Sequence, residues 1–191
     1  MISVQNLSKS FDRKPVLQNL SFDVADGEKI HLSAPSGVGK TTLLRILAGL
    51  ESADRGSVRG VSANQISFLF QEPRLFPQLT ALQNVTCVHP DEEKAREKAL
   101  ILLEKLGLSE AVNQYPDELS GGMKQRVALA RALSVDRPVL FLDEPFTALD
   151  AQLKDSVRKT VAEFCQNKTL ILVSHDPQDA EILTQRTLGL T

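Results

Sequence analysis

The residues best suited to chemistry lie in one stretch, Glu28–Thr42, which ends in Gly-Lys-Thr-Thr. It predicts a short strand, a tight loop and a helix, close to the phosphate-binding pattern G-x-x-x-x-G-K-[ST]. Loop amides and the N-terminus of the following helix converge on one anion, and Lys40 adds a full positive charge. Ala34 stands where the pattern has its first glycine, and its methyl group is tolerable if its φ angle is negative. We therefore expect a site for nucleotide phosphates.

A second pair of glycines lies at the start of an expected helix, within Leu119–Arg126. Ser120 is a favourable N-cap, but glycines in a first helical turn destabilise the helix by about 1 kcal/mol each relative to alanine. Close approach of a ligand to bare backbone at Gly121 and Gly122 is a good physical reason for such a loss.

Two acidic residues end a buried apolar strand that begins at Val139. They are Asp143 and Glu144, and they come directly after four apolar residues. Carboxylates at the C-terminal end of a strand, beside a phosphate loop, can hold Mg²⁺ and activate water.

Two further residues have both a functional and a simpler interpretation. Gln71 follows the expected strand Ile66–Phe70, where open α/β sheets bind ligands, although by itself it is more simply a helix-entry residue. Phe11 is an aromatic residue on an expected polar turn. It fits either edge packing or a ring stacked on a purine.

The composition is that of an ordinary soluble globular protein. The chain has 191 residues, of which 42% are apolar and 24% charged, with a formal net charge of −2. The balanced charge gives no case for a nucleic-acid partner. There is no run of about 18 or more apolar residues, so any membrane would have to be reached through a partner. Cys87 and Cys165 lack metal-ligand spacing, which favours reduced thiols in a cytosolic protein.

The elements that position the loop are expected on both sides of it. Alternating patterns predict strands over Ile2–Leu7 and Val16–Val24, joined by a turn at Ser8–Pro15. With the strand that enters the loop, they favour a small antiparallel sheet beside an α/β core. Helical spacing of leucines follows over Thr41–Leu50, and Asp54–Ser57 predicts a turn.

A mainly helical subdomain is expected over residues 73–135, inserted between core strands. Asp91 can cap a helix within it. The apolar piece Leu75–Thr80 has no alternation and fits either a docking surface for a partner or ordinary core. The chain then returns to strands and helices, with a last edge strand over Arg186–Thr191. We interpret the whole chain, 1–191, as one α/β domain.

The order of these motifs resembles that of the ATP-binding cassette ATPases, and the likeness covers nearly the whole chain. Its most specific part is Leu119–Arg126, which is similar to the signature that separates this family from other phosphate-loop proteins. The resemblance implies a P-loop NTPase core with a mainly parallel sheet, an N-terminal antiparallel β subdomain and an inserted α-helical subdomain. It also implies ATP as the nucleotide and Mg²⁺ as the cofactor.

The resemblance gives the phosphate loop its roles residue by residue. Lys40 would contact the β- and γ-phosphates, Thr41 would ligate Mg²⁺, and Thr42 would reach the α-phosphate. Phe11 is similar to the ring that stacks on adenine, a position at which many relatives have tyrosine. The implied nucleotide-binding set is Phe11, Ala34, Pro35, Ser36, Gly37, Val38, Gly39, Lys40, Thr41 and Thr42.

The catalytic set implied by the resemblance is Glu144, His175 and Gln71. Glu144 would be the general base, and His175 would contact the γ-phosphate. Gln71 would sense Mg²⁺ and the attacking water, and Asp143 would hold Mg²⁺ through water. The implied metal set is therefore Thr41, Gln71 and Asp143. Positioning and charge stabilisation carry most of the catalysis in such transfers.

In this family two cassettes pair head to tail and enclose two ATP molecules. Ser120, Gly121 and Gly122 would then grip the γ-phosphate bound to the opposite chain, and Asp150 would lie at the dimer seam. The pairing would explain the costly pair of glycines, and it implies that a lone protomer hydrolyses ATP poorly.

The resemblance implies the ATPase subunit of an importer-type transporter. The runs Glu144–Asp150 and Leu75–Val85 look like those of importer cassettes, in which the second is the docking region for the membrane subunit. The expected partners are a second cassette, as a homodimer, separate permease subunits and a solute-binding protein, with no nucleic acid. Among importers, the sequence most resembles the ATPase subunits of nitrate, sulfonate and taurine systems. The expected location is peripheral, at the cytoplasmic face of the inner membrane.

Two alternatives remain open at this stage. An export cassette could work with a separate permease. A soluble cassette protein could act on translation or DNA, although such proteins usually carry two cassettes or long coiled-coil insertions. The chain also stops soon after His175, so a truncated cassette is a further possibility.

Overall fold

The computed structural model describes residues 1–35, 37–147 and 149–190. Ser36, which belongs to the expected nucleotide-binding set, therefore lies outside the described residues. Contacts divide the chain into two compact units. The first comprises Met1–Phe68, Arg137–Asp143 and Asn167–Thr191, and the second comprises Leu69–Asp136 and Glu144–Gln166. The single domain over 1–191, with its helical part at 73–135, stays a prediction, and each unit is described by itself.

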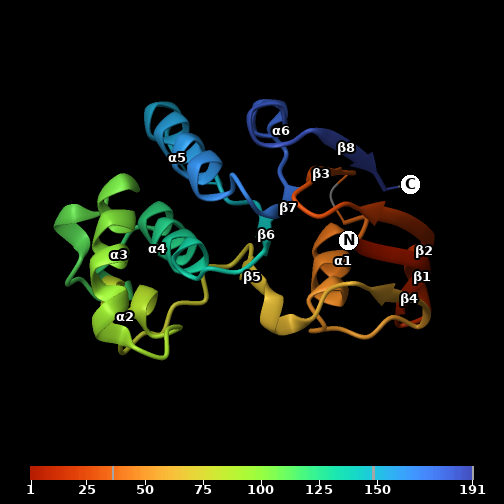
Figure 1. The fold of residues 1–191 in the computed structure, drawn as a ribbon, viewed down its shortest axis with the longest axis horizontal. Coiled ribbons are helices and arrows are strands. Elements are labelled where there is room, and N and C mark those ends of the chain that lie inside the picture. The colour runs from red at the N-terminus through yellow and green to blue at the C-terminus, as the bar shows by residue number, and fades with distance from the viewer. Residues whose placement is uncertain (36, 148, 191) are drawn as a thin grey trace. The chain divides into compact units, whose positions relative to one another are not determined.

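The first unit is built on a sheet of five strands in the order β5-β6-β7-β3-β8 (Figure 1). The strands are β3 (Lys29–Ser33), β5 (Ile66–Leu69), β6 (Val139–Asp143), β7 (Thr169–Val173) and β8 (Arg186–Gly189). Strand β7 pairs in parallel with β6 and β3, and β3 pairs in parallel with β8. Every residue of β6 and β7 is buried, which accounts for their nearly continuous apolar sequence. The expected parallel core is thus confirmed.

An antiparallel sheet of three strands, in the order β2-β1-β4, also belongs to the first unit. Its strands are β1 (Ile2–Phe11), β2 (Lys14–Val24) and β4 (Arg55–Arg59). The turn predicted over Ser8–Pro15 was wrong, because β1 continues to Phe11 and only Asp12 and Arg13 turn the chain. Register shifts between β1 and β2 break the alternation on which that prediction relied.

Two boundaries near the phosphate loop also differ from the predictions. The turn expected at Asp54–Ser57 is instead the start of β4, where Gly56 has a φ of 88° and passes close to β1. A Cβ atom on Gly56 would lie 2.4 Å from the carbonyl oxygen of Gln5. The helix expected over Thr41–Leu50 is α1 (Lys40–Leu47), and the chain leaves it at Gly49, which has a φ of 71°.

The core of the first unit joins both sheets to α1. Leu7 of β1, Leu32 of β3 and Leu43 of α1 belong to one cluster of buried residues and are fully inaccessible to solvent. Figure 1 shows α1 beside the three-stranded sheet. The start of α1, and with it the phosphate loop, is therefore held by apolar packing from two sheets.

Helix α6 (Pro177–Leu183) follows β7 in the first unit. The Asp176 side chain caps it by accepting the amide of Gln178 at 3.0 Å, and Pro177 occupies the first helical position. Aspartate followed by proline is a common entry to a helix, since proline needs no amide at the first helical position. Within the described ranges, no helix of either unit has the length and apolar content needed to cross a bilayer.

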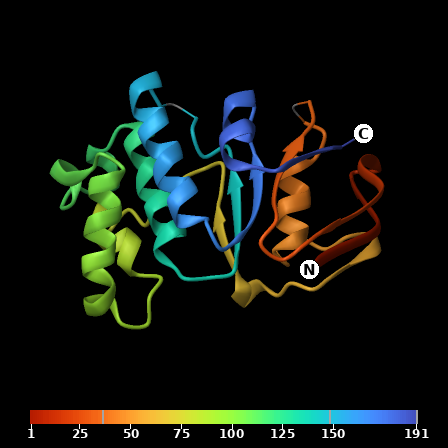
Figure 2. The same ribbon diagram turned by 45° about the horizontal axis from the view of Figure 1, so that its top comes forward.

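The second unit consists mainly of helices, with short 3-10 turns between them. The helices are α2 (Ala81–Thr86), α3 (Glu92–Lys105), α4 (Gly121–Ser134) and α5 (Ala151–Phe164). Helices α2, α3 and α4 pack against one another, as Figure 2 shows. All four of these helices begin at a side chain that accepts a backbone amide of the first turn. These capping residues are Thr80, Asp91, Ser120 and Asp150.

Candidate nucleotide site

The phosphate loop connects β3 to α1 and depends on glycine at one position above all. Gly39 precedes α1 with a φ of 103°, and a Cβ atom there would lie 2.6 Å from Cγ1 of Val16. No other residue type could adopt this backbone without moving β2. Ala34, in contrast, does not have a positive φ, and its methyl group packs against the core cluster. The alanine is therefore compatible with the loop geometry.

The lysine of the loop is buried and points back at the loop itself. Only 7% of Lys40 is exposed, and its Nζ donates to the carbonyl oxygens of Ala34 at 2.6 Å and Pro35 at 3.1 Å. The ammonium group thus lies against the backbone that begins the loop. Phosphate oxygens that approach Lys40 would meet a full positive charge in a partly desolvated setting.

A side-chain hydrogen bond joins the start of α1 to the end of β6. Thr41 Oγ1 donates to Oδ2 of Asp143 at 2.7 Å, although the two residues are 102 positions apart in the chain. Asp143 is 1% exposed. Burial raises the pKa of the Asp143 carboxyl, and the Thr41 hydrogen bond and the charges of Arg45 and Lys40 oppose that rise. The neighbouring hydrogen bond and positive charges therefore do not fully offset the cost of burying the Asp143 carboxylate in its charged form.

These oxygens fit a magnesium ion that is shared with substrate phosphates. The hydroxyl of Thr41 and the carboxylate of Asp143 are hard oxygen donors placed side by side. In the part of the chain that the structure describes, no three or more His, Cys, Asp or Glu side chains gather as a metal site. Mg²⁺ commonly takes one or two protein oxygens and completes its shell with phosphates and water, so this small donor set suits it.

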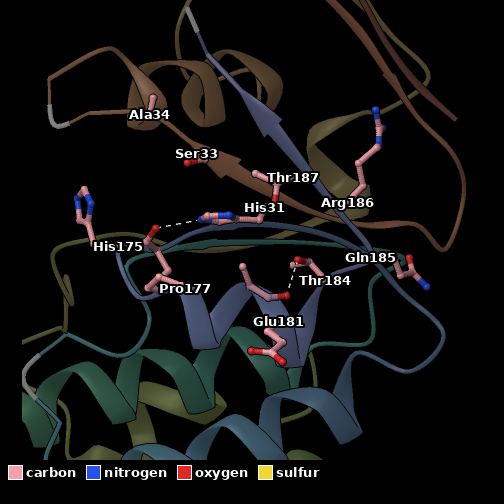
Figure 3. A pocket seen from close by; sticks show the side chains of 12 residues that line it. His31, Ser33, Ala34, His175, Pro177, Glu181, Thr184, Gln185, Arg186 and Thr187 are labelled. Carbon is pink, nitrogen blue, oxygen red and sulfur yellow. Dashed lines mark hydrogen bonds between the residues drawn. The ribbon is translucent and has the colours of Figure 1, made fainter.

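His175 and the start of the phosphate loop line one pocket of about 510 Å³ (Figure 3). The pocket opens between the ends of β3 and β7, helix α6 and β8. The Ser33 and Ala34 side of the loop forms one wall, and His175, which is exposed, stands at another. The further lining residues are His31, Ser174, Pro177, Ala180, Glu181, Thr184, Gln185, Arg186 and Thr187.

Phe11 ends β1 and is 43% exposed. The ammonium group of Lys9 lies 4.9 Å from the centroid of the ring. Lys9 itself pairs with Glu51 at 2.7 Å and donates to the carbonyl of Ser52 at 2.8 Å. The ring is therefore supported from one side by a fixed cation and still has surface available for contact with a flat partner.

Two of the expected catalytic residues belong to the second unit. Glu144 follows β6 with a φ of 53°, a backbone conformation that is uncommon for residues other than glycine. The amide of Gln125, on α4, donates to the Glu144 carbonyl at 3.5 Å. Gln71 lies just beyond β5 and is exposed. Backbone strain of the kind seen at Glu144 gathers at functional sites.

The start of α4 has an exposed and open backbone. Ser120 Oγ accepts the amide of Met123 at 3.2 Å, which caps the helix. Gly121 is exposed, and a Cβ atom on it would have no neighbour within 4 Å. Nothing in the described surroundings requires a glycine at this position. Asp150 is exposed and caps α5 by accepting the amide of Leu153 at 2.9 Å, so its position has a structural explanation of its own.

The expected site residues thus divide between the units. The first unit contains Phe11, Asp143, His175 and the loop 34–42, and it brings Thr41 and Asp143 into contact and Ala34 and His175 into one pocket. The second unit contains Gln71, Glu144, Ser120, Gly121, Gly122 and Asp150. Lys9 and His31 also lie near these residues, and neither was predicted from the sequence. For His31, the available signal was a polar residue within the apolar strand that enters the loop.

Comparison with protein families shows to which family the chain belongs. A family model described as ABC transporter matches residues 17–147. The chain belongs to the ABC transporter family. This cassette is 42% identical to the sulfate/thiosulfate import ATP-binding protein CysA 2 of Rhizobium meliloti, over 100% of the cassette and 57% of that protein. It is 40% identical to the corresponding protein of Pseudomonas syringae pv. tomato, over 97% of the cassette and 63% of that protein. The cassette therefore spans about 57–63% of the length of these relatives.

Solved structures show the same fold. The cassette matches a dimeric, post-hydrolysis state of the ATP-binding cassette MJ0796 bound to ADP and Pi, with a TM-score of 0.91 and 30% identity. The match covers 100% of the cassette and 94% of that chain. It confirms the predicted fold class, a P-loop cassette with a parallel sheet, an antiparallel sheet and helices.

Proposed function

We propose that this cassette is the ATP-hydrolysing subunit of a transporter, which energises the passage of a small solute through separate permease subunits. The observation that carries the proposal is the contact between Thr41 and Asp143. It places a loop hydroxyl, a buried carboxylate and the cradle of Lys40 at one point. That combination suits the triphosphate of a nucleotide together with a divalent cation.

Lys40 and the loop amides bind the phosphates in this proposal. The ammonium group of Lys40 exchanges its bonds to the carbonyls of Ala34 and Pro35 for bonds to the β- and γ-phosphates. Thr41 and, through water, Asp143 would hold Mg²⁺, with Gln71 as a further contact. The metal neutralises charge that develops on the phosphates. Phe11 stacks on the adenine, and Thr42 reaches the α-phosphate.

Glu144 acts as the general base and accepts a proton from the attacking water. Gln71 orients that water, and His175 contacts the γ-phosphate. Glu144 follows Asp143 directly in the chain, so one strand end supplies the metal contact and the base. Most of the acceleration comes from holding these groups in place rather than from covalent chemistry.

A second cassette completes the site in this proposal. Ser120, Gly121 and Gly122 of one chain grip the γ-phosphate held by the other, with Asp150 at the seam. The open backbone at Gly121 supports this reading, since an unobstructed helix start can receive an anion. The solved relative bound to ADP and Pi is a dimer, which also supports the pairing.

The two named relatives import sulfate and thiosulfate, as their names state. We propose an anion of this type as the transported solute here as well, rather than the nitrate, sulfonate or taurine suggested by the resemblance of the sequence. The permease subunits and a solute-binding protein would select it. The cassette would then lie on the cytoplasmic face of the inner membrane as a peripheral subunit.

The substitution Glu144→Gln tests the assigned chemistry. The variant should bind ATP as the original does, lose nearly all turnover, and accumulate as an ATP-bound dimer, because only proton acceptance is removed. Nucleotide binding, phosphate release and size-exclusion chromatography measure the three effects. Glu97→Gln, at an exposed position of α3, is the control and should change none of them. Unchanged turnover in Glu144→Gln would remove Glu144 as the base.

The concentration dependence of turnover tests the need for a second cassette. ATP hydrolysis per chain should rise with protein concentration, because the complete site forms only on association. Addition of membranes that contain the cognate permease should raise it further, and the two should purify together. Hydrolysis per chain that stays constant across the dilution series would rule out the shared site.

A further inference from the structure

A buried histidine lies in the strand that enters the phosphate loop. His31 is 7% exposed, and its neighbours in β3, Ile30 and Leu32, are fully buried apolar residues. Nε2 of His31 lies 3.0 Å from the carbonyl oxygen of Ser174. A carbonyl oxygen can only accept, so Nε2 carries the proton and donates it. An apolar side chain in this strand would have avoided the cost of burying an imidazole.

The bond joins two strand ends that both carry site residues. In the register of β3 and β7, His31 is opposite Leu172 and Leu32 is opposite Val173. The ring of His31 therefore reaches beyond its own partner to Ser174, the residue that follows β7 and precedes His175. Figure 3 shows this contact at the wall of the pocket that Ala34 and His175 share.

Ser174 is held from its other side as well. Its hydroxyl donates to the carboxylate of Asp179, which is on α6 and 1% exposed, and accepts the amide of Asp176 at 3.1 Å. The side chain of Ser174 is thus fixed by α6, while its carbonyl is fixed by β3 through His31. The peptide that leads into His175 has little freedom to rotate while both sets of bonds are present.

We propose that His31 is a positioning residue for His175. It ties the peptide before His175 to the strand that carries the phosphate loop, so that the imidazole of His175 keeps its place relative to Lys40 and the nucleotide. The inference deepens the proposed function and rests on it for the role of His175. It adds a residue that touches neither nucleotide nor metal and acts through the Ser174 carbonyl.

Turnover measurements on substituted proteins test the proposal. His31→Leu should lower kcat about tenfold, the effect of one lost hydrogen bond to a positioned group, and leave KM for ATP unchanged. His31→Gln should recover most of that loss, because its amide nitrogen can donate to the same carbonyl. His89→Leu is the matched control, since it removes a half-buried histidine bonded to Ser134 in the other unit, and it should leave kcat unchanged.

A double-mutant cycle separates positioning from a general loss of stability. In a protein that already carries His175→Ala, the change His31→Leu should lower kcat no further. Equal fold losses in the two backgrounds would overturn the proposal. If His175→Ala by itself left turnover unchanged, the role of His175 in the proposed function would be the part that failed.

Nuclear magnetic resonance of the histidine rings tests the link from His31 through Ser174 to His175 independently of ATP turnover. The chain has three histidines, so ring signals can be assigned from single substitutions. The Nε2 of His31 should be found protonated. His31→Leu should shift or broaden the ring signals of His175, whereas His31→Gln should restore them. Ring signals of His175 that are identical in all three proteins would overturn the inference, whatever the ATPase assay shows.

Discussion

Two helix N-termini, one in each unit, carry glycines for different physical reasons. At α1, Gly39 has a φ of 103° and no room for a side chain beside Val16. At α4, Gly121 has no neighbour within 4 Å of an added Cβ. The fold requires the first glycine, whereas the second is not required by its surroundings and lowers the stability of its helix. The helix start at α1 also contains its own cation, Lys40, whereas α4 begins with an uncharged cap, Ser120.

The difference separates a helix start whose loop, lysine and carboxylate come from one unit from a helix start that remains open. The loop before α1 has its strained backbone, its lysine and a carboxylate in contact with Thr41, all from the first unit. The start of α4 has exposed backbone at Gly121 and an exposed serine at the cap. We therefore expect a substitution at the start of α1 to lower both stability and function, and one at the start of α4 to raise stability while it lowers activity.

The largest effect is expected for Gly39→Ala. An alanine at this φ costs about 1–2 kcal/mol, and its collision with Val16 adds about 1–3 kcal/mol. The free energy of unfolding should fall by about 3 kcal/mol, and affinity for ATP should fall by about 100-fold as the loop shifts. Denaturant titration and nucleotide binding measure the two effects. Gly27→Ala has a similar φ of 76° and no neighbour within 4 Å, so it should lose stability through strain only and keep its ATP affinity.

The next effect concerns the carboxylate of Asp143, which Thr41 of α1 contacts. Asp143→Asn should lower turnover about 100-fold, because the charge that balances the metal is lost. The same change should raise the melting temperature of the nucleotide-free protein by about 2–4 °C, since burial raises the pKa of Asp143 and its charge opposes folding. Asparagine can still accept from Thr41. A melting temperature that falls would contradict this; Asp117→Asn, at an exposed position, is the control.

At the open helix start, the change in stability should have the opposite sign to that for Gly39. Gly121→Ala should raise the free energy of unfolding by about 0.5–1 kcal/mol, because alanine favours the helix. Turnover should fall about tenfold, since the methyl group would obstruct the phosphate of the opposite chain. Gly189→Ala, another glycine with open space around it, should leave turnover unchanged. Full turnover in Gly121→Ala would contradict a functional role for the open backbone at the start of α4.

The smallest effect lies at a part of the first unit that touches neither helix start. The amide of Ala25 and the guanidinium of Arg186 hold the pKa of Glu28 below its ordinary value of 4.5. The ionised Glu28 carboxylate therefore stabilises the fold above pH 4.5, and this stabilisation disappears as pH falls through the lowered pKa. Melting curves of Glu28→Gln and the original should differ at pH 7 and converge near pH 3.

The sequence predicted the site best where strand order alone determines neighbours. Thr41 and Asp143 could be expected together, because the carboxyl ends of parallel strands meet at one edge of the sheet. The extent of β1 could not be predicted, since register shifts hide the alternation near Phe11. The role of His31 was also out of reach, because a sequence does not say which carbonyl a buried imidazole meets. Whether the loop tolerates alanine at position 34 could be judged only from the φ and the packing of Ala34 in the structure.

The bonds from Lys40 to the carbonyls of Ala34 and Pro35 have a consequence for the nucleotide-free protein. The ammonium group serves as a placeholder that keeps the loop in shape before any phosphate arrives. In the proposed function, binding would exchange these partners for phosphate oxygens rather than order a free chain, so its entropic cost would be small. The same bonds would compete with an incoming phosphate. Affinity for ATP would then be a difference between two sets of contacts, and a change that strengthened the bonds from Lys40 to the loop carbonyls would weaken the hold on the nucleotide.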